Sequence, residues 1–262
     1  MNSSLFRTET ELSLEEILLN RGLFFGETPF TTLLMSDGNI VGLELHMLRL
    51  KKCVEYLFKV DFNDYDSLVR ESLMKAYEKI GQYYIRITFY KTLSGKIDFF
   101  IYKDVFTAKE SSLELGLSNS IKGKSLIPSF LKVGNYLEYS MELSERTDCN
   151  ELLYVDFEDY ILESGTSNIF IINEEEILTP SLRSGVLDGV TRQILLQFLS
   201  QEDYRFKEAD IKLSVLDTAS EIWLCNGLRG IRVVDRFKTR KLSNSVWTTL
   251  NDKYEKFCEK LW

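Results

Sequence analysis

The amino-acid sequence predicts a mixed α/β (α+β) fold in two parts. Stretches in which apolar residues alternate with polar ones follow stretches in which apolar residues recur at helical spacing, along most of the chain. A polar stretch with a glycine and a proline, residues 117–129, lies near the middle. With 262 residues, of which 44% are hydrophobic, the chain is long enough for two modest domains, each with its own core.

The first part is predicted to contain a hairpin, two helices and two further strands. Residues 30–36 and 40–43 flank the tripeptide DGN, which is typical of a tight turn between two strands. The apolar residues of segment 44–59 fall on one face of a helix. The other elements expected here are a helix over 64–80 and strands rich in aromatic and β-branched residues over 83–90 and 97–102.

The second part is predicted to repeat this mixture of strands and helices. We expect a smaller N-terminal domain at 1–115, an interdomain linker at 116–127 and a larger C-terminal domain at 128–262. The elements expected in the C-terminal domain are helices over 134–147, from 189 onward and over 242–260, and strands over 151–156, 160–163, 168–173, 221–225 and 230–235.

Charge and composition argue against several classes of protein. There are 32 Lys and Arg against 40 Asp and Glu, and the net charge of −8 argues against a nucleic-acid-binding or membrane-coating protein. A single histidine and four dispersed cysteines predict neither a metal site nor a disulfide framework. No membrane-spanning or signal segment is visible, so we expect a cytoplasmic protein.

Two residues stand out as candidates for chemistry. Lys132 is flanked by apolar residues at the expected start of a helix, where loss of water would lower its pKa and make its amine a base or nucleophile. Taken in isolation, a surface lysine with a buried stem is the better interpretation of this residue. Glu163 ends an expected strand before a run of small residues, and it could face a ligand or cap the turn.

Two turns complete the candidate set. Residues 187–199 (LDGVTRQILLQFL) begin an amphipathic helix, and its N-terminus could bind a phosphate or be capped in the ordinary way by Asp188. Residues 223–234 (WLCNGLRGIRVV) predict a hairpin with an Asn-Gly turn, which needs no functional explanation by itself.

Taken in order, these segments resemble the fold-type IV pyridoxal-phosphate enzymes. This group includes branched-chain aminotransferases, D-amino-acid transaminases and 4-amino-4-deoxychorismate lyases. The resemblance covers almost the whole chain and implies the two-domain fold of these enzymes. The matching segments are NRGLFFGETPFTT (20–32), DGNIVGLELHMLRL (37–50), LKVGNYLE (131–138), LESGTSNIF (162–170), ILTPSLRSGVLDGVTRQ (177–193) and CNGLRGIRVV (225–234).

The resemblance implies pyridoxal 5'-phosphate as cofactor and a role for individual residues. Lys132 matches the catalytic lysine that carries the cofactor, Glu163 the carboxylate beside its pyridine nitrogen, and Arg49 an arginine that binds its phosphate. An adjacent carboxylate favours a protonated pyridine nitrogen, and arginine and a helix N-terminus suit a phosphate. The other cofactor-binding residues implied are Asn168, Val190, Thr191, Asn226 and Gly227.

Local details resemble the lyases more than the transaminases. The spacing Lys132-Val-Gly-Asn is that of lyases and D-amino-acid transaminases, and the loop KTLSGK (91–96) lacks the Arg and His by which the latter hold a carboxylate. The same loop also departs from the lyases, which usually carry a glycine-rich loop with arginine at this place. Substrate contacts are then expected from Arg229, Thr31 and Lys91. His46 is given a structural role, one helical turn from Arg49.

Three hypotheses follow. The first is a lyase that converts 4-amino-4-deoxychorismate to 4-aminobenzoate and pyruvate, a step of folate biosynthesis. The second is an aminotransferase that acts on a small or branched-chain amino acid with a 2-oxo acid acceptor. The third is a cofactor-binding protein without catalysis. A small-molecule substrate and a homodimer are implied by the resemblance, and no nucleic-acid or membrane partner is expected.

Overall fold

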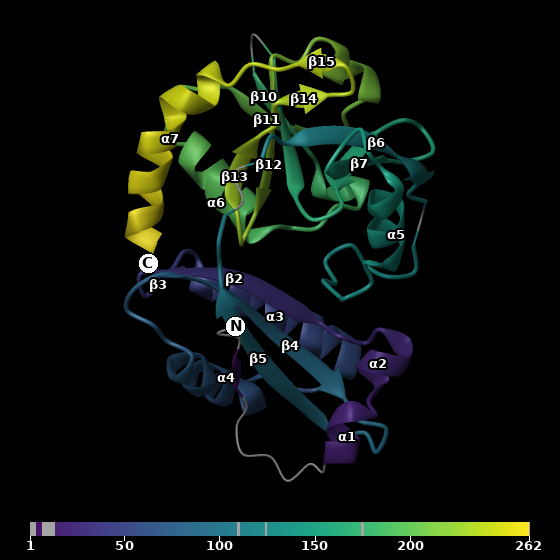
Figure 1. Ribbon diagram of the computed structural model, residues 1–262, viewed down its shortest axis with the longest axis vertical. Coiled ribbons are helices and arrows are strands. Elements are labelled where there is room, and N and C mark those ends of the chain that lie inside the picture. Colours follow the sequence, from purple (N-terminus) through teal and green to yellow (C-terminus); the bar gives the residue numbers. More distant parts are fainter. Residues whose placement is uncertain (1–3, 7–13, 109–110, 124, 174–175, 262) are drawn as a thin grey trace. The chain divides into compact units, whose positions relative to one another are not determined.

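The chain forms two compact units. The computed structural model describes residues 4–6, 14–108, 111–123, 125–173 and 176–261. Unit 1 takes in the described residues up to Ala108 together with the segment Phe130–Asn135, and unit 2 takes in those of the ranges 109–129 and 136–261 (Figure 1).

Unit 1 is built on a five-stranded antiparallel sheet in the order β1-β5-β4-β2-β3. The long central strands carry alternating buried side chains, which explains why their sequences are rich in aromatic and β-branched residues. The strands are β1 (Ser4–Phe6), β2 (Phe30–Ser36), β3 (Asn39–Ile40), β4 (Gln82–Lys91) and β5 (Ile97–Val105).

The predicted hairpin is confirmed, and its turn has the expected geometry. Asp37 and Gly38 both have positive φ, 47° and 81°, as a two-residue hairpin turn between twisted strands requires. Strand β2 pairs with β3 from Met35 opposite Ile40 to Ser36 opposite Asn39.

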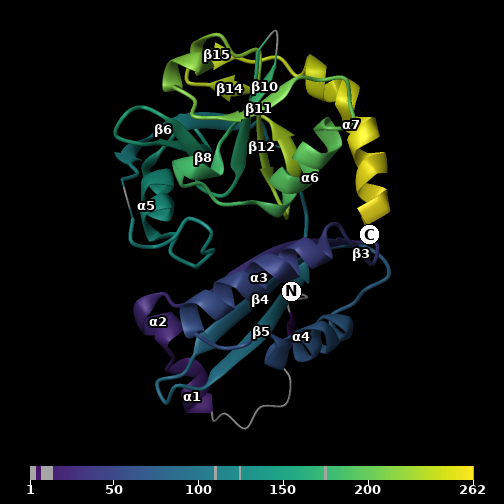
Figure 2. The ribbon, with the colours of Figure 1, turned by 180° about the vertical axis from the view of Figure 1, so that it is seen from behind.

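Helices cover one face of this sheet. The predicted helices at 44–59 and 64–80 are confirmed as α3 (Leu43–Phe58) and a shorter α4 (Asn63–Lys75). Figure 2 shows α3 lying across the strands. Apolar side chains of α3 and α4 share one core with those of β2, β4 and β5, including Leu50, Val54, Leu33, Ile85 and Phe99. Two short helices, α1 (Leu14–Leu18) and α2 (Arg21–Phe25), precede β2.

Unit 2 contains two five-stranded sheets. Their orders are β11-β10-β9-β12-β13 and β15-β14-β6-β7-β8, and both mix parallel and antiparallel pairs. The strands are β6 (Glu114–Ile121), β7 (Glu151–Val155), β8 (Ile161–Ser164), β9 (Asn168–Ile172), β10 (Ile177–Pro180), β11 (Phe206–Ala209), β12 (Glu221–Asn226), β13 (Gly230–Val233), β14 (Arg236–Phe237) and β15 (Arg240–Lys241).

Buried apolar residues of both sheets form one core. Strand β9 is buried along its whole length, as are β7 and most of β12, so these strands read as continuous apolar runs. Residues of β6, β7, β9 and β12 pack together in this core, including Leu115, Leu153, Ile169 and Leu224. The helices of unit 2 are α5 (Leu137–Glu145), α6 (Val190–Leu199) and α7 (Ser245–Cys258), with 3-10 turns at Leu182–Ser184, Leu213–Asp217 and Glu259–Leu261.

The segment expected as a linker differs from that expectation. Residues 116–121 belong to β6, which pairs in parallel with β7 and also with β14. Leu115 and Ser118 are buried in this strand. The polar residues Ser118 and Ser120 are two positions apart, as side chains on one face of a strand are. The composition that suggested a linker is therefore that of a strand with several small polar side chains.

The chain then returns to unit 1 for six residues. Within segment Phe130–Asn135, Val133 forms a β-bridge with Pro29. The Phe30 N–H donates a hydrogen bond to the carbonyl of Lys132 at 3.0 Å. These contacts attach the segment of the expected catalytic lysine to the start of β2.

Two general features bear on the sequence-based expectations. The four cysteines are free thiols and all are buried. Within the described ranges, no helix has the length and apolar character needed to cross a membrane, and no group of three His, Cys, Asp or Glu side chains is arranged to bind a metal ion.

Candidate functional site

In unit 1, three side chains of β2 and α3 form a buried polar network. Thr31 Oγ1 lies 2.8 Å from His46 Nδ1 and accepts a hydrogen bond from Arg49 Nη2 at 3.0 Å. Arg49 Nη2 also lies 3.4 Å from His46 Nδ1. His46 and Arg49 are one turn apart on α3, so both face the same strand. The network fixes the guanidinium of Arg49, the arginine expected to bind phosphate.

His46 is held in its neutral form. It is 2% exposed. Burial lowers the pKa of its imidazole well below 6.5, and the positive charges of Arg49 and Lys132 lower it further. A neutral ring can accept the Thr31 proton and adds no repulsion between the two cations. The structural role expected for His46 is consistent with this geometry.

Lys132 is fixed by its main chain. Its carbonyl accepts from Phe30, and its N–H points to Cys53 Sγ at 3.5 Å. Cys53 Sγ also lies 3.4 Å from the carbonyl of Phe130. Cys53 follows Arg49 by one turn of α3, so this helix positions both the arginine and the lysine segment. Further along the segment, the Gly134 N–H donates to Thr28 Oγ1 at 3.2 Å.

Lys132 shares an aromatic ring with a second cation. Its Nζ lies 4.7 Å from the centroid of the Phe30 ring, and the Arg86 guanidinium carbon lies 3.6 Å from the same centroid. Arg86 is half-buried in β4 and donates through Nε to Thr88 Oγ1 at 3.1 Å. Arg86 is not among the site residues expected from the sequence. The charged residue within the apolar strand YYIRITFY was the signal that could have indicated it.

In unit 2, Glu163 lies in β8 and is oriented by several groups. Its Oε2 accepts from the Leu187 N–H at 3.1 Å and lies 3.4 Å from Asn168 Nδ2. Its Oε1 lies 3.9 Å from Lys122 Nζ. The carboxylate is 19% exposed, so it is partly accessible while its orientation is fixed.

The predicted helix N-terminus is present. Val190 and Thr191 are the first two residues of α6, are 2% and 7% exposed, and follow Gly189 at the N-cap. No side chain caps this end among the residues that the structure describes, and Asp188 does not take that position. The amide groups of the first turn and the positive end of the helix dipole thus suit an anion.

The Asn226-Gly227 turn is tied to the start of β9. Asn226 Oδ1 accepts from the N–H groups of Leu228 and Arg229, and its Nδ2 donates to Ser167 Oγ at 3.0 Å. Strand β12 pairs with β9 with Cys225 opposite Asn168, which explains this proximity. The side chain of Asn226 therefore stabilises its own turn.

The three expected substrate-binding residues have different surroundings. Thr31 is fully buried, and its hydroxyl supports Arg49 and His46, so it does not present a free hydroxyl to a substrate. Lys91 ends β4, and its charge contributes to lowering the pKa of Glu27, behind the larger effect of Arg21. Arg229 is exposed, and its charge adds to the effect of burial in lowering the pKa of Arg232.

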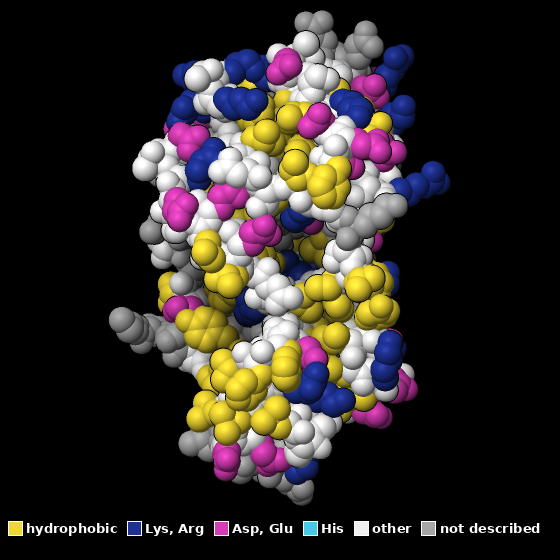
Figure 3. All heavy atoms as spheres, turned by 90° about the vertical axis from the view of Figure 1, so that its right-hand side faces the viewer, with side chains coloured by type: hydrophobic (Ala, Val, Ile, Leu, Met, Phe, Trp, Pro, Cys, Tyr) yellow, Lys and Arg dark blue, Asp and Glu magenta, His cyan; other side chains and the backbone are white. Residues whose placement is uncertain are grey.

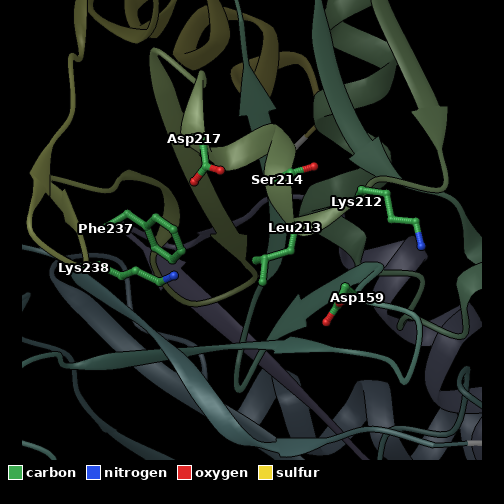
Figure 4. A pocket seen from close by; sticks show the side chains of 7 residues that line it. All are labelled: Asp159, Lys212, Leu213, Ser214, Asp217, Phe237 and Lys238. Atoms are coloured by element: carbon green, nitrogen blue, oxygen red, sulfur yellow. The ribbon is translucent and has the colours of Figure 1, made fainter.

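A hollow elsewhere in unit 2 contains none of these residues. It has a volume of about 350 Å³ and lies beside the 3-10 turn Leu213–Asp217 and the end of β14 (Figure 4). Lysine and aspartate side chains both line it, so its charge is mixed. It takes no part in the candidate site.

Comparison with known families decides the relationship. A sequence profile described as "Amino-transferase class IV" matches residues 28–237, which is most of the chain. The chain belongs to the class IV aminotransferase family. This family is pyridoxal-phosphate-dependent, so the enzyme class and the cofactor expected from the sequence are confirmed at the level of the family.

Relatives in the class IV family carry two kinds of name. An aminodeoxychorismate lyase of Vibrio harveyi is 24% identical over 231 residues, 82% of this chain and 84% of that protein. A probable branched-chain-amino-acid aminotransferase of Thermotoga maritima is 22% identical over 260 residues, 96% of this chain and 93% of that protein. The family thus includes both reactions considered above.

Solved structures of class IV enzymes confirm the fold. An aminotransferase of Brucella abortus, solved with bound pyridoxal phosphate, matches with a TM-score of 0.83 at 18% identity and covers 98% of this chain and 99% of its own. The predicted two-part fold of mixed helices and sheets is therefore the class IV fold.

The side chains of both units fit the cofactor chemically. Unit 1 supplies a guanidinium and a primary amine, Arg49 and Lys132, on a rigid strand and helix. Unit 2 supplies a partly exposed carboxylate, Glu163, and an uncapped helix N-terminus at Val190. Phosphate suits the guanidinium and the helix end, an aldehyde suits the amine, and a pyridinium nitrogen suits the carboxylate.

Proposed function

We propose that this class IV enzyme is a lyase that converts 4-amino-4-deoxychorismate to 4-aminobenzoate and pyruvate, a step of folate biosynthesis. The lyase-like spacing after Lys132 and the Vibrio harveyi relative support this choice. The observation that carries the proposal is that Arg86 and Lys132 contact the same ring, Phe30, so a group suited to a carboxylate and the proposed reactive amine share one neighbour.

In this proposal each unit has a defined task. Arg49 and the N-terminus of α6 bind the cofactor phosphate, and Glu163 keeps the pyridine nitrogen protonated. When bound, the cofactor supplies an electron sink. Lys132 Nζ would hold the cofactor through its aldehyde and, once freed by the substrate amine, would take the proton from the ring carbon that bears this amine and return a proton as pyruvate leaves. Asn226 and Gly227 form the second phosphate turn.

The substrate has two carboxylates, and we assign one of them to Arg86. A planar guanidinium can bind a carboxylate through two hydrogen bonds, and the Phe30 ring limits its rotation. Arg229 remains a candidate for the second carboxylate because its guanidinium is positively charged and the residue is exposed. Lys91 is the other candidate from the sequence.

The test is pyruvate release without any 2-oxo acid. The cofactor-loaded protein is given 4-amino-4-deoxychorismate, and pyruvate is measured with lactate dehydrogenase. We expect turnover from the parent and from the exposed-lysine control Lys51→Ala, and a loss of about 10²- to 10⁴-fold or more in Lys132→Ala, since the proton-transfer group is removed. Arg86→Leu should raise KM about 10- to 100-fold, because a charged hydrogen-bond partner is lost. No pyruvate from cofactor-loaded parent protein contradicts the lyase assignment.

The second candidate is an aminotransferase acting on a small or branched-chain amino acid. It is favoured by the Thermotoga maritima relative, whose match extends over 96% of this chain. In that reaction Lys132 moves a proton between the substrate α-carbon and the cofactor. A panel of amino acids with 2-oxoglutarate distinguishes the two: turnover that requires the acceptor indicates the aminotransferase. Bound cofactor with neither activity indicates the third hypothesis, a cofactor-binding protein without catalysis.

We further propose that two copies associate. Apolar side chains of α2 are largely exposed, with Leu23 at 69%, Phe24 at 55% and Phe25 at 62%. Figure 3 looks onto the side of Figure 1 where α2 lies and shows hydrophobic side chains at the surface. Exposed apolar clusters of this kind mark association surfaces. Sedimentation should give a dimer for the parent and a monomer for Phe24→Glu. We also propose that the protein is cytoplasmic and acts on a small molecule.

A further inference from the structure

Asn168 directs its side chain into unit 2. It is the first residue of β9 and is 6% exposed. Its Nδ2 donates to the carbonyl of Leu187 at 2.8 Å and lies 3.4 Å from Glu163 Oε2. Both of these contacts of the amide nitrogen are therefore made with oxygen atoms of unit 2.

The backbone N–H and carbonyl of Leu187 are hydrogen-bonded to the side chains of Glu163 and Asn168, respectively. Its N–H donates to Glu163 Oε2 at 3.1 Å, and its carbonyl accepts from Asn168. Glu163, Asn168 and Leu187 thus form a closed ring of hydrogen bonds. The Leu187 carbonyl also accepts from the Gly189 N–H at 2.9 Å, which extends the ring to the N-cap of α6.

Gly189 shows how closely the amide approaches the helix. A Cβ at this position would lie 2.0 Å from Asn168 Oδ1, a distance that no real side chain can adopt. The φ of Gly189 is −71°, which any residue tolerates, so space and not backbone conformation requires glycine here. The Asn168 side chain is thus in contact with the residue that begins α6.

We propose that Asn168 is a positioning residue which, through Leu187, fixes the Glu163 carboxylate and the N-terminus of α6 as one rigid element. This differs from the direct cofactor contact that the family resemblance implies for Asn168. The inference rests on the proposed function, in which Glu163 binds the pyridine nitrogen and α6 binds the phosphate. The two groups then keep a constant separation.

This arrangement predicts that Asn168 and Glu163 act together. Removing the amide frees Leu187 on one side, and the carboxylate then loses its orientation. A residue that touched the cofactor directly would contribute independently of Glu163. A double-mutant cycle separates these cases because it measures the interaction between two side chains.

The experiment measures cofactor affinity without turnover. The dissociation constants of pyridoxal 5'-phosphate and of pyridoxal, which lacks the phosphate, are determined by spectroscopic titration. The proteins are the parent, Asn168→Ala, Asn168→Asp, Glu163→Gln and Asn168→Ala with Glu163→Gln. The matched control is Asn150→Ala, since Asn150 also joins two backbone groups, Ser112 O and the Glu114 N–H. Thermal unfolding checks that each protein is folded, and Asn168→Asp keeps the size of the side chain.

We expect Asn168→Ala to weaken pyridoxal 5'-phosphate binding about 10-fold or more, as the loss of a hydrogen bond to a charged group does. In the Glu163→Gln background the same change should cost less than about 3-fold. The ratio of the pyridoxal to the pyridoxal 5'-phosphate dissociation constant should fall, because α6 is displaced as well. Asn150→Ala should change the affinities less than about 2-fold.

Three results would overturn the inference. An undiminished loss in the Glu163→Gln background would make Asn168 a direct cofactor contact. Unchanged affinities in both Asn168 variants, with only a lower unfolding temperature, would make it merely structural. A parent protein that binds no pyridoxal 5'-phosphate would overturn the proposed cofactor roles together with this inference. Failure to release pyruvate would affect the lyase proposal alone, because the affinity measurement involves no turnover.

Discussion

The candidate functional residues of the two units are of different chemical kinds. Unit 1 presents side-chain cations, Arg49, Arg86 and Lys132, on a strand-and-helix framework with one neutral histidine. Unit 2 presents a single carboxylate, Glu163, together with backbone N–H groups at a helix end and a turn. The candidate functional groups of unit 1 are thus side chains, whereas most of those of unit 2 are backbone N–H groups.

The comparison shows that the two units should respond differently to substitution. In unit 1 a truncated side chain removes the functional group itself. In unit 2 most single substitutions leave the backbone N–H in place, and only changes that move the backbone should matter. Four predictions examine this difference, from the largest expected effect to the smallest.

Arg49→Ala should weaken pyridoxal 5'-phosphate binding about 10- to 150-fold, because a charged hydrogen-bond partner of the phosphate is lost. Thr191→Val, at the other proposed phosphate site, keeps the backbone N–H and should change the affinity less than about 3-fold. Titration of both variants with the cofactor gives the two values. Equal losses would mean that unit 2 also relies on a side chain here.

Gly189→Ala should destabilise the protein by about 1–3 kcal/mol, because its Cβ would overlap Asn168 Oδ1. Gly185 provides the contrast: a Cβ there meets nothing within 4 Å, but its φ is +84°. Gly185→Ala should cost about 1 kcal/mol through backbone strain alone. Urea unfolding measures both. Only the Gly189 defect should be relieved by Asn168→Gly, and a defect that persists would contradict the steric explanation.

Stability should fall as the pH decreases from 7 to 5.5, through His46. The unfolded chain takes up a proton near the ordinary pKa of about 6.5. In the folded protein, burial keeps the pKa of His46 well below that value. The unfolded state then binds more protons as the pH falls, at up to about 1.4 kcal/mol per pH unit.

Urea unfolding at the two pH values, on the parent and on His46→Gln, tests this dependence. Burial raises the pKa of Glu151, which acts in the opposite direction, but equally in both proteins. A slope that survives in His46→Gln would assign the dependence to another group.

Cys53→Ser should have the smallest effect, less than about 1 kcal/mol in the free energy of unfolding. Sulfur forms weak hydrogen bonds, and the contacts to Lys132 N and Phe130 O are 3.5 and 3.4 Å long. A hydroxyl is a stronger hydrogen-bonding group than a thiol, which offsets its smaller size. Chemical denaturation and cofactor titration should both give values near those of the parent. A loss of affinity above about 10-fold would show that the lysine segment depends on the larger sulfur atom.

The spacing of hydrophobic residues predicted the helices and strands that have one buried face. It did not predict strands that are polar or very short. The hairpin at 30–40 and helix α3 follow from alternating and helical apolar patterns. Strand β6 was mistaken for a linker because Ser118 and Ser120 carry small polar side chains on a strand held by neighbours distant in sequence. Strands β11, β14 and β15 have only two to four residues. Over so few residues, tertiary contacts outweigh the intrinsic β-strand propensity, so the sequence does not indicate these strands.

The predicted site residues exist at the expected kinds of place, but their surroundings depend on packing that no local pattern contains. The hydroxyl of Thr31 faces inward because β2 pairs with β4 and lies under α3. Arg86 was overlooked because only the fold brings it to the same ring as Lys132. Asn168 was recognised from its motif, while its partner Leu187 is linked through backbone atoms, which sequence does not distinguish.

The return of segment Phe130–Asn135 to unit 1 has a consequence for the order in which the protein is made. Strand β2 leaves the ribosome about one hundred residues before the lysine that it holds through the Phe30 N–H. At translation rates of about 5–20 residues per second, Lys132 is synthesised about 5 to 20 seconds after β2. The proposed reactive amine is therefore added to the chain after Arg49 and Arg86, once synthesis of unit 2 has begun.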